Sequence, residues 1–216
     1  HLFVDAGTVV PGFSLPDDGV EFFCHAPFIE HCDEATDIIR NRAALVFNVR
    51  FSAGGSYFDF LEVGDAGWED LEDIVRITKY HNNHDRLAWD LFNIPHHCSY
   101  LALSDEKGER QTIPKPLVKE LLLSGKRDAN IVSCSNPIPD FKEAYDQVLP
   151  PHIQARKAYA AHLAEVGGRQ FLVTMEEPNA SRPEPIVFEV GPHGIWKRRA
   201  ATGAAAIVSS SPPRAG

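Results

Sequence analysis

Two short segments of the sequence contain side chains that can do acid–base or metal chemistry. The first is Gly64-Asp65, which ends an apolar, strand-like segment, and the second is the run from Pro95 to Ser99 (PHHCS), which ends the next one. Layered folds commonly place reactive residues where strands end, so a carboxylate and an imidazole from neighbouring strand ends can converge. Asp and His are ligands of zinc, manganese and iron. The pattern therefore indicates a candidate metal site.

Each segment also has a purely structural interpretation. An Asp that follows a strand commonly caps the next helix, because its oxygen accepts a helix N–H. A His-His pair is also often part of a packed turn. The occurrence of both segments in this order favours the metal interpretation for Asp65, His96 and His97. Cys24-His25 and His31-Cys32 lack the spacing of a zinc finger, and we expect them to be structural.

The hydrophobic pattern predicts the elements that position these residues. Apolar and polar residues alternate in 45–51, and 57–63 is a second, largely apolar strand-like segment. A Gly-Gly turn lies between them, which predicts a β-hairpin. From 67 to 80 the apolar residues recur with helical spacing, and acidic residues crowd the first turns, as the helix dipole favours. The other expected elements are strands at 20–24, 87–94, 130–133, 170–175 and 186–190, and helices at 114–126, 141–149 and 151–166.

Charge and cysteine content narrow the class of protein. The net charge of −9 argues against a basic nucleic-acid wrapper, although it is compatible with a local phosphate site. No apolar run is long enough for a transmembrane helix, so we expect no membrane association. The 4 cysteines are scattered and form no C-x-x-C pair, which favours a reducing, cytoplasmic location over a disulfide scaffold.

Three segments together resemble a known family. They are 41–47 (NRAALVF), 60–66 (FLEVGDA) and 92–99 (FNIPHHCS), and they resemble the second half of a metallo-β-lactamase-fold domain. The greatest similarity is to the hydrolase domain of competence DNA-uptake (ComEC-like) proteins, where one strand ends in Gly-Asp and a later strand in Pro-His-His-Gly-Ser. The resemblance covers about residues 20–140. It implies an α/β fold, specifically the second half of an αββα sandwich.

The resemblance also implies a chemistry. In that family the Asp of Gly-Asp bridges two metal ions, and a His of the His-His pair is a ligand of one of them. These roles fall on Asp65 and on either His97 or His96, with Asp65 and His97 as the expected catalytic residues. Two zinc or manganese ions would activate the bridged water for hydrolysis. The implied reaction is cleavage of a phosphodiester, with a nucleic acid as the expected substrate.

Two departures from the family pattern affect this interpretation. Cys98 replaces the family's Gly, at a turn where a positive φ is expected. The family's main ligand motif, His-x-His-x-Asp-His, does not occur in this sequence, and the run 81–85 (HNNHD) has a different spacing. Three protein ligands are usual for one catalytic zinc. We therefore expect the motif on a partner, the first half of the same domain, which is a separate chain or was removed by cleavage before His1.

The same observations permit a non-catalytic alternative. The fold would then serve as a binding or regulatory component of a multi-protein bacterial assembly. Under either interpretation we expect three regions: the half-domain at 1–140, an extension of helices and strands at 141–199, and a flexible low-complexity tail at 200–216. The extension is the expected contact surface for a protein partner.

Overall fold

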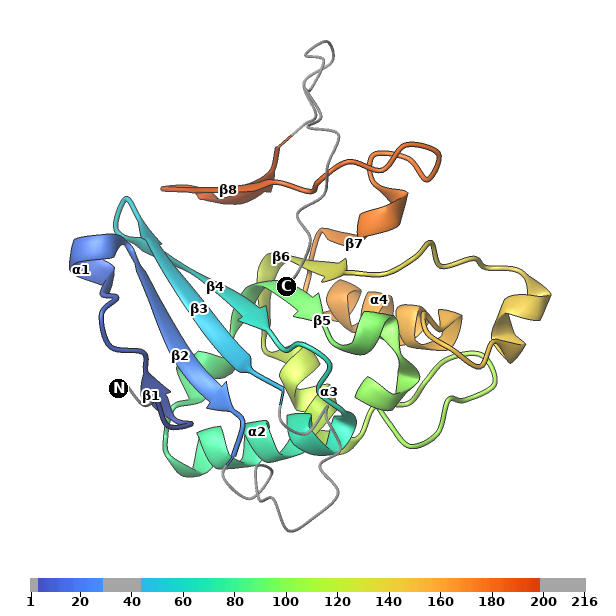
Figure 1. Ribbon diagram of the computed structural model, residues 1–216, viewed down its shortest axis with the longest axis horizontal. Coiled ribbons are helices and arrows are strands. Elements are labelled where there is room, and N and C mark those ends of the chain that lie inside the picture. Colours follow the sequence, from blue (N-terminus) through green and yellow to red (C-terminus); the bar gives the residue numbers. More distant parts are fainter. Residues whose placement is uncertain (1–3, 29–43, 199–216) are drawn as a thin grey trace, which may run out of the picture.

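The computed structural model describes residues 4–28 and 44–198. These residues form an α/β fold with a seven-stranded mixed sheet and a separate two-stranded hairpin. Figure 1 shows the sheet with helices beneath it. The tail expected at 200–216 and the pair His31-Cys32 lie outside the described residues.

The strands of the main sheet lie side by side in the order in which they occur in the chain, from β1 to β7. The first four are antiparallel, and β4 to β7 are parallel. Their bounds are β1 Thr8–Val9, β2 Val20–Ala26, β3 Val46–Ala53, β4 Ser56–Glu62, β5 Trp89–Ile94, β6 Gly125–Ser133 and β7 Gln170–Val173. The β3–β4 pair confirms the predicted hairpin, because the two strands pair antiparallel across the turn at Gly54-Gly55.

Three helices cover one face of this sheet (Figure 1). They are α2 Trp68–Tyr80, α3 Pro116–Leu123 and α4 Ile153–Glu165, and a short α1 Leu15–Asp18 precedes β2. In α2 the backbone N–H of Gly67 donates to Asp70 at 3.1 Å, which satisfies a donor at the helix start. Short 3₁₀ turns connect the other elements: η3 His84–Leu87, η4 His96–Cys98, η5 Tyr100–Ala102, η6 Lys142–Asp146 and η7 Thr174–Glu176.

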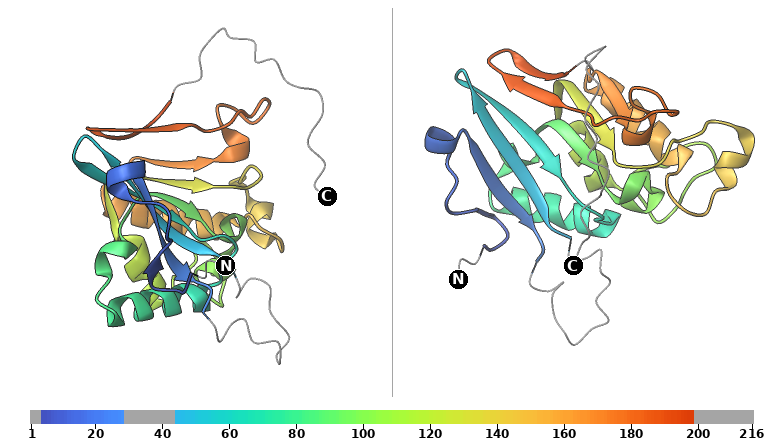
Figure 2. Two further views of the ribbon diagram at one scale, coloured as in Figure 1. Left: turned by 60° about the vertical axis from the view of Figure 1, so that its left-hand side comes forward. Right: turned by 45° about the horizontal axis from the view of Figure 1, so that its top comes forward.

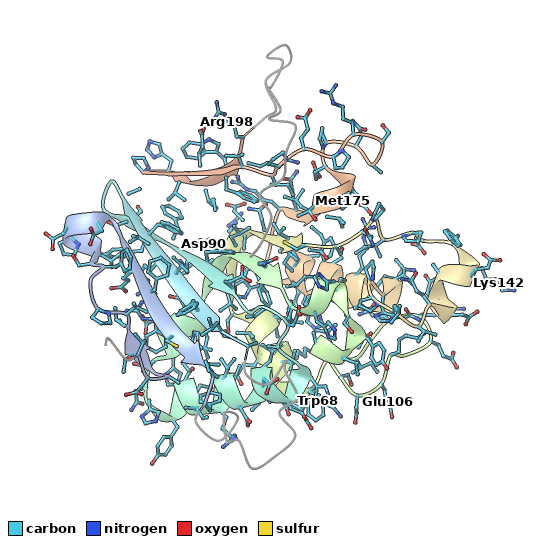
Figure 3. The ribbon with its side chains drawn as sticks, viewed as in Figure 1. Trp68, Asp90, Glu106, Lys142, Met175 and Arg198 are labelled. Atoms are coloured by element: carbon cyan, nitrogen blue, oxygen red, sulfur yellow. The ribbon has the colours of Figure 1, made fainter. Side chains whose placement is uncertain are left out.

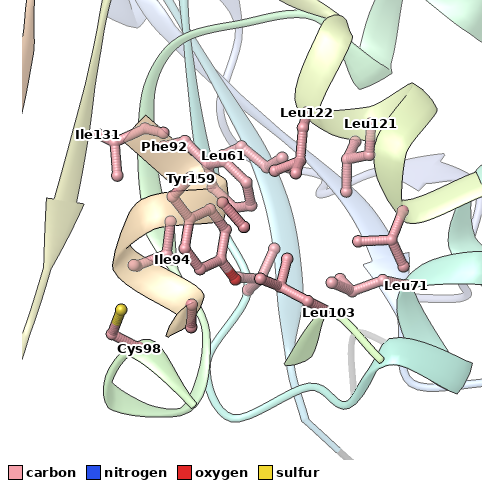
Figure 4. Packing of buried hydrophobic residues seen from close by; sticks show 14 of the residues in the cluster. Leu61, Leu71, Phe92, Ile94, Cys98, Leu103, Leu121, Leu122, Ile131 and Tyr159 are labelled. Atoms are coloured by element: carbon pink, nitrogen blue, oxygen red, sulfur yellow. The ribbon is translucent and has the colours of Figure 1, made fainter. Parts of the chain in front are cut away.

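The main core lies between the sheet and these helices. Trp89 and Phe92 from β5 are fully buried there, as is Tyr159 from α4. The indole N–H of Trp89 donates to the carbonyl of Leu121 at 3.0 Å, so the buried donor is satisfied. Figure 4 shows that Cys98, just beyond the end of β5, belongs to the same cluster.

The opposite face of the sheet is covered by a second, smaller layer. The hairpin consists of β8 Phe188–Gly191 and β9 Gly194–Lys197, and Figure 2 shows it above the sheet, on the side away from the helices. Phe188 and Ile195 pack against Leu91 and its buried neighbours on β6 and β7. The parallel strands are therefore buried on both faces, as their apolar sequences require.

One expectation about the second part of the chain was wrong. The helix expected at 141–149 is only the 3₁₀ turn η6. Its apolar residues recur with helical spacing, but Phe141, Val148 and Leu149 are exposed, so no tertiary packing supports a helix there. Within the region expected as an extension, 141–199, α4 packs in the main core and β7 pairs with β6, while β8 and β9 form a C-terminal hairpin outside the main sheet. None of the described helices has the length and apolar character needed to span a bilayer.

Candidate functional site

Asp65 and His97 meet at the carboxyl ends of two neighbouring parallel strands. β4 and β5 are in register with Glu62 beside Asn93, so the loops that follow them leave the sheet at the same edge. Nε2 of His97 lies 3.8 Å from Oδ1 of Asp65, and both side chains are about half exposed. The backbone N–H of His96 donates to the carbonyl of Gly64 at 3.1 Å, which ties the two loops together.

The turn that carries His97 has an uncommon backbone. His96, His97 and Cys98 have φ values of 50°, 52° and 64°, so three successive non-glycine residues are left-handed. This conformation costs an L-residue roughly 1–2 kcal/mol. Contacts from elsewhere hold the turn: the backbone N–H of His152 donates to the carbonyl of Cys98 at 3.0 Å. Strain of this kind is characteristic of functional sites. It also agrees with the positive φ expected where the family has Gly.

The orientation of the His97 ring follows from one hydrogen bond. Nδ1 lies 2.7 Å from the backbone carbonyl of Cys134, at the end of β6. A carbonyl only accepts, so Nδ1 carries the hydrogen and donates it. In the neutral imidazole Nε2 then has the free lone pair, and this is the nitrogen that faces Asp65. The ring is therefore set in the tautomer that a metal ligand needs.

A short chain of polar groups supports Cys134. Its thiol donates to Oδ1 of Asn93 at 3.3 Å, and the amide of Asn93 donates to both oxygens of Glu62 at 3.1 and 2.8 Å. Burial raises the pKa of the Cys134 thiol, and the nearby charge of Glu62 raises it further. The sulfur is thus held as a neutral thiol. Its hydrogen bond to Asn93 on β5, which in turn bonds Glu62 on β4, fixes the position of Cys134. The backbone carbonyl of Cys134 then orients the ring of His97.

The structure distinguishes His97 from His96, between which the sequence did not allow a choice of metal ligand. His97 faces Asp65, whereas His96 has a half-buried side chain on the side of His152. Burial lowers the pKa of His152, and the charges of Lys107 and His96 lower it further. Asp65 makes no hydrogen bond within 4–28 and 44–198, so both of its carboxylate oxygens are available there.

Asp65 and His97 fit a metal ion in donor chemistry but do not complete its coordination. Two ligands of one tetrahedral zinc are about 3.3 Å apart, given metal–ligand bonds of about 2.0–2.2 Å. The 3.8 Å between Oδ1 and Nε2 is near this value and too long for a hydrogen bond. In the part of the chain that the structure describes, no group of three or more His, Cys, Asp and Glu side chains can hold an ion. Further ligands would have to come from elsewhere.

A pocket of about 410 Å³ opens beside His97. Its walls are the loop Cys134–Asn136 after β6, the Pro150-Pro151 pair before α4, and Thr174 and Met175 after β7. Figure 3 labels Met175 in the turn that follows β7. The pocket and the Asp65–His97 pair thus share the edge formed by the carboxyl ends of the parallel strands, which is where open α/β sheets bind ligands.

Sequence reasoning did not identify Glu62, Asn93 or Cys134 as parts of this site. Glu62 and Asn93 are paired polar residues near the ends of two apolar strands, and this was the available signal. Cys134 follows a strand in the same way that Asp65 and Pro95 do. Its position beside His97 depends on the pairing of β5 with β6.

Comparisons with protein-family models, with curated proteins and with solved structures find no match to this chain. A function must therefore be argued from the geometry of the site itself.

Proposed function

We propose that this chain is the second half of a metallo-β-lactamase-type hydrolase that cleaves phosphodiesters, as a phosphodiesterase or nuclease. The observation that carries the proposal is the Asp65–His97 pair, in which Nε2 of His97, the nitrogen not used by the Cys134 carbonyl, lies 3.8 Å from the carboxylate. Asp65 would bridge two zinc or manganese ions through its two oxygens. His97 would be a ligand of one of them, and His96 would support the turn.

The surroundings of the pair support a metal more than a simple ion pair. An exposed His–Asp contact at this distance contributes little stability, so it does not offset three left-handed residues. A hydrogen-bonded second layer that fixes the ring is what metal-bound histidines have. Divalent cations at such a site acidify water and stabilise the negative charge that develops on a phosphoryl group.

The proposal requires a partner polypeptide. That partner would carry the His-x-His-x-Asp-His motif and supply the remaining ligands, since Asp65 and His97 are two donors and three are usual for each catalytic ion. Both side chains are about half exposed, so they are open to approach from outside this chain.

Zinc titration of this chain tests the metal site, with the imidazole nitrogens followed by NMR. The Nε2 signal of His97 is expected to shift with added zinc, because it has the free lone pair. Asp65→Ala is expected to weaken the response of His97 by at least about tenfold, the lower end of what loss of a supporting residue costs. His84→Ala, which removes an exposed histidine outside the site, should leave it unchanged. If the zinc-induced shift of His97 is the same in Asp65→Ala as in the native chain, the proposal is contradicted.

A second measurement separates the hydrolase from the non-catalytic alternative. Once a partner polypeptide with the His-rich motif is combined with this chain, the assembly should contain about two metal ions, as two-metal sites do. It should also hydrolyse bis(p-nitrophenyl) phosphate, and Asp65→Ala should abolish that activity. Metal binding without hydrolysis would favour a binding or regulatory component.

A further inference from the structure

The pocket beside His97 has a lining that selects for an uncharged, partly apolar group. Pro150, Pro151 and Met175 supply apolar surface, and the polar groups are neutral hydroxyl, thiol and amide groups. Among its lining residues only His97, at one end, can carry a charge in the neutral pH range. A phosphate bound within the pocket itself would meet no lysine or arginine from this lining. The anionic part of a ligand would therefore lie at the Asp65–His97 end, where the metal ions of the proposed function would offset the charge of Asp65.

Asn136 is the group best placed to recognise a ligand in this pocket. Its side chain is exposed, and it makes no hydrogen bond within the described part of the chain. The neighbouring hydroxyls are already used, since Ser135 donates to the carbonyl of Asn136 at 3.1 Å and Thr174 donates to that of Ser135 at 3.4 Å. An amide offers one donor edge and one acceptor edge in a plane, which is the pattern that pairs with the edge of a nucleobase.

We propose that this pocket binds the nucleobase of a nucleotide whose phosphate lies at Asp65 and His97, an inference that rests on the proposed function. The 410 Å³ volume is in the range of pockets for small ligands and exceeds what a base alone needs. Asn136 pairs with the edge of the base, and Pro150 and Met175 contact its faces. The position of the pocket also sets the orientation of the bound nucleotide. The nucleoside lies over the ends of β6 and β7, and the phosphate lies over the ends of β4 and β5.

Saturation-transfer NMR of this chain with the four deoxynucleosides tests the inference, because nucleosides lack the phosphate and need no metal. Transfer is expected to be stronger to base protons than to sugar protons. Asn136→Ala should weaken binding by about fivefold, the effect of one lost neutral hydrogen bond. Met175→Ala should also weaken it. Gln170→Ala removes an exposed amide at the opposite end of β7 and should have no effect.

Each outcome bears on the pocket separately from the metal site. Absence of transfer from a protein whose thermal midpoint is normal would overturn the inference, as would binding that Asn136→Ala and Met175→Ala leave intact. Transfer to N-acetylglycine amide in place of the nucleosides would also overturn it, in favour of a peptide. Because the zinc titration reads His97 directly, a normal zinc response with no nucleoside binding would reject the pocket assignment alone. Nucleoside binding without a zinc response would support the pocket assignment and count against zinc binding by this chain without its partner.

Discussion

Asp59→Ala is expected to destabilise the fold by about 3 kcal/mol, the lower end of the cost of breaking a buried ion pair. Asp59 is only 2% exposed and accepts hydrogen bonds from Nε of Arg50 at 2.7 Å and from Nζ of Lys126 at 2.8 Å. Burial lowers the pKa of Lys126, but Asp59 and Asp90 outweigh this and raise it above its usual value. Without Asp59, the largely buried guanidinium of Arg50 loses the carboxylate that offsets its positive charge. Urea unfolding measures the loss.

The control for this prediction is the other partner of the same guanidinium. Asp85 accepts from Nη1 of Arg50 at 3.0 Å, but its side chain is 61% exposed. Because water can solvate the guanidinium once an exposed carboxylate is removed, Asp85→Ala should lower the free energy of unfolding by under about 1 kcal/mol. Equal losses in the two variants would show that burial of Asp59 does not determine the strength of this network.

Lowering the pH from 6.5 to 4 is expected to reduce the free energy of unfolding by about 3 kcal/mol through His25 alone. His25 is buried between β2 and α2, where Nδ1 contacts the hydroxyl of Thr78 at 3.1 Å and Nε2 contacts the carbonyl of Arg86 at 3.0 Å. Burial lowers its pKa from 6.5 to about 4, and the positive charge of Arg86 acts in the same direction. The neutral ring in the folded state therefore resists protonation.

The sign follows from proton binding. Between pH 6.5 and 4 the unfolded chain binds a proton at His25 and the folded chain does not, so acid favours unfolding. His152 also has a lowered pKa and contributes in the same direction. Chemical denaturation at several pH values, for the native chain and for His25→Gln, isolates His25 as the difference between the two slopes. Identical slopes would contradict a strongly lowered pKa.

Much of the sheet was predictable because local pattern and final environment agree. β3 and β4 are apolar segments joined by a Gly-Gly turn, and α2 has one apolar face and acidic residues in its first turn. The helix expected at 141–149 did not form although its apolar residues have helical spacing, because Val148 and Leu149 are left exposed and nothing packs against that face. β7 and β8 were both predicted as strands, but no local signal says that β7 joins the main sheet and β8 the hairpin. That choice depends on contacts between distant segments.

The candidate site, like the fold, was predictable from the sequence only in part. That Asp65 and a histidine approach each other follows from two motifs at neighbouring strand ends. Which histidine does so was not predictable, because the left-handed turn at 96–98 is held by Gly64 and His152 from other segments. The pocket was not predictable either, since its walls come from three separate loops. The absent ligand motif was noticed from sequence, and the described residues contain no three-ligand cluster that replaces it.

The order of strands in the main sheet has a consequence for how the protein is made. Each strand from β2 to β7 lies beside the strand that precedes it in the chain, so no later strand inserts between earlier ones. During translation, every newly emerged strand can therefore dock on an edge that already exists. A ribosome releasing the chain from its amino end would build the sheet in one direction. The β3–β4 hairpin joins neighbouring residues and can form rapidly, whereas the parallel pairs from β4 to β7 join more distant segments and form more slowly.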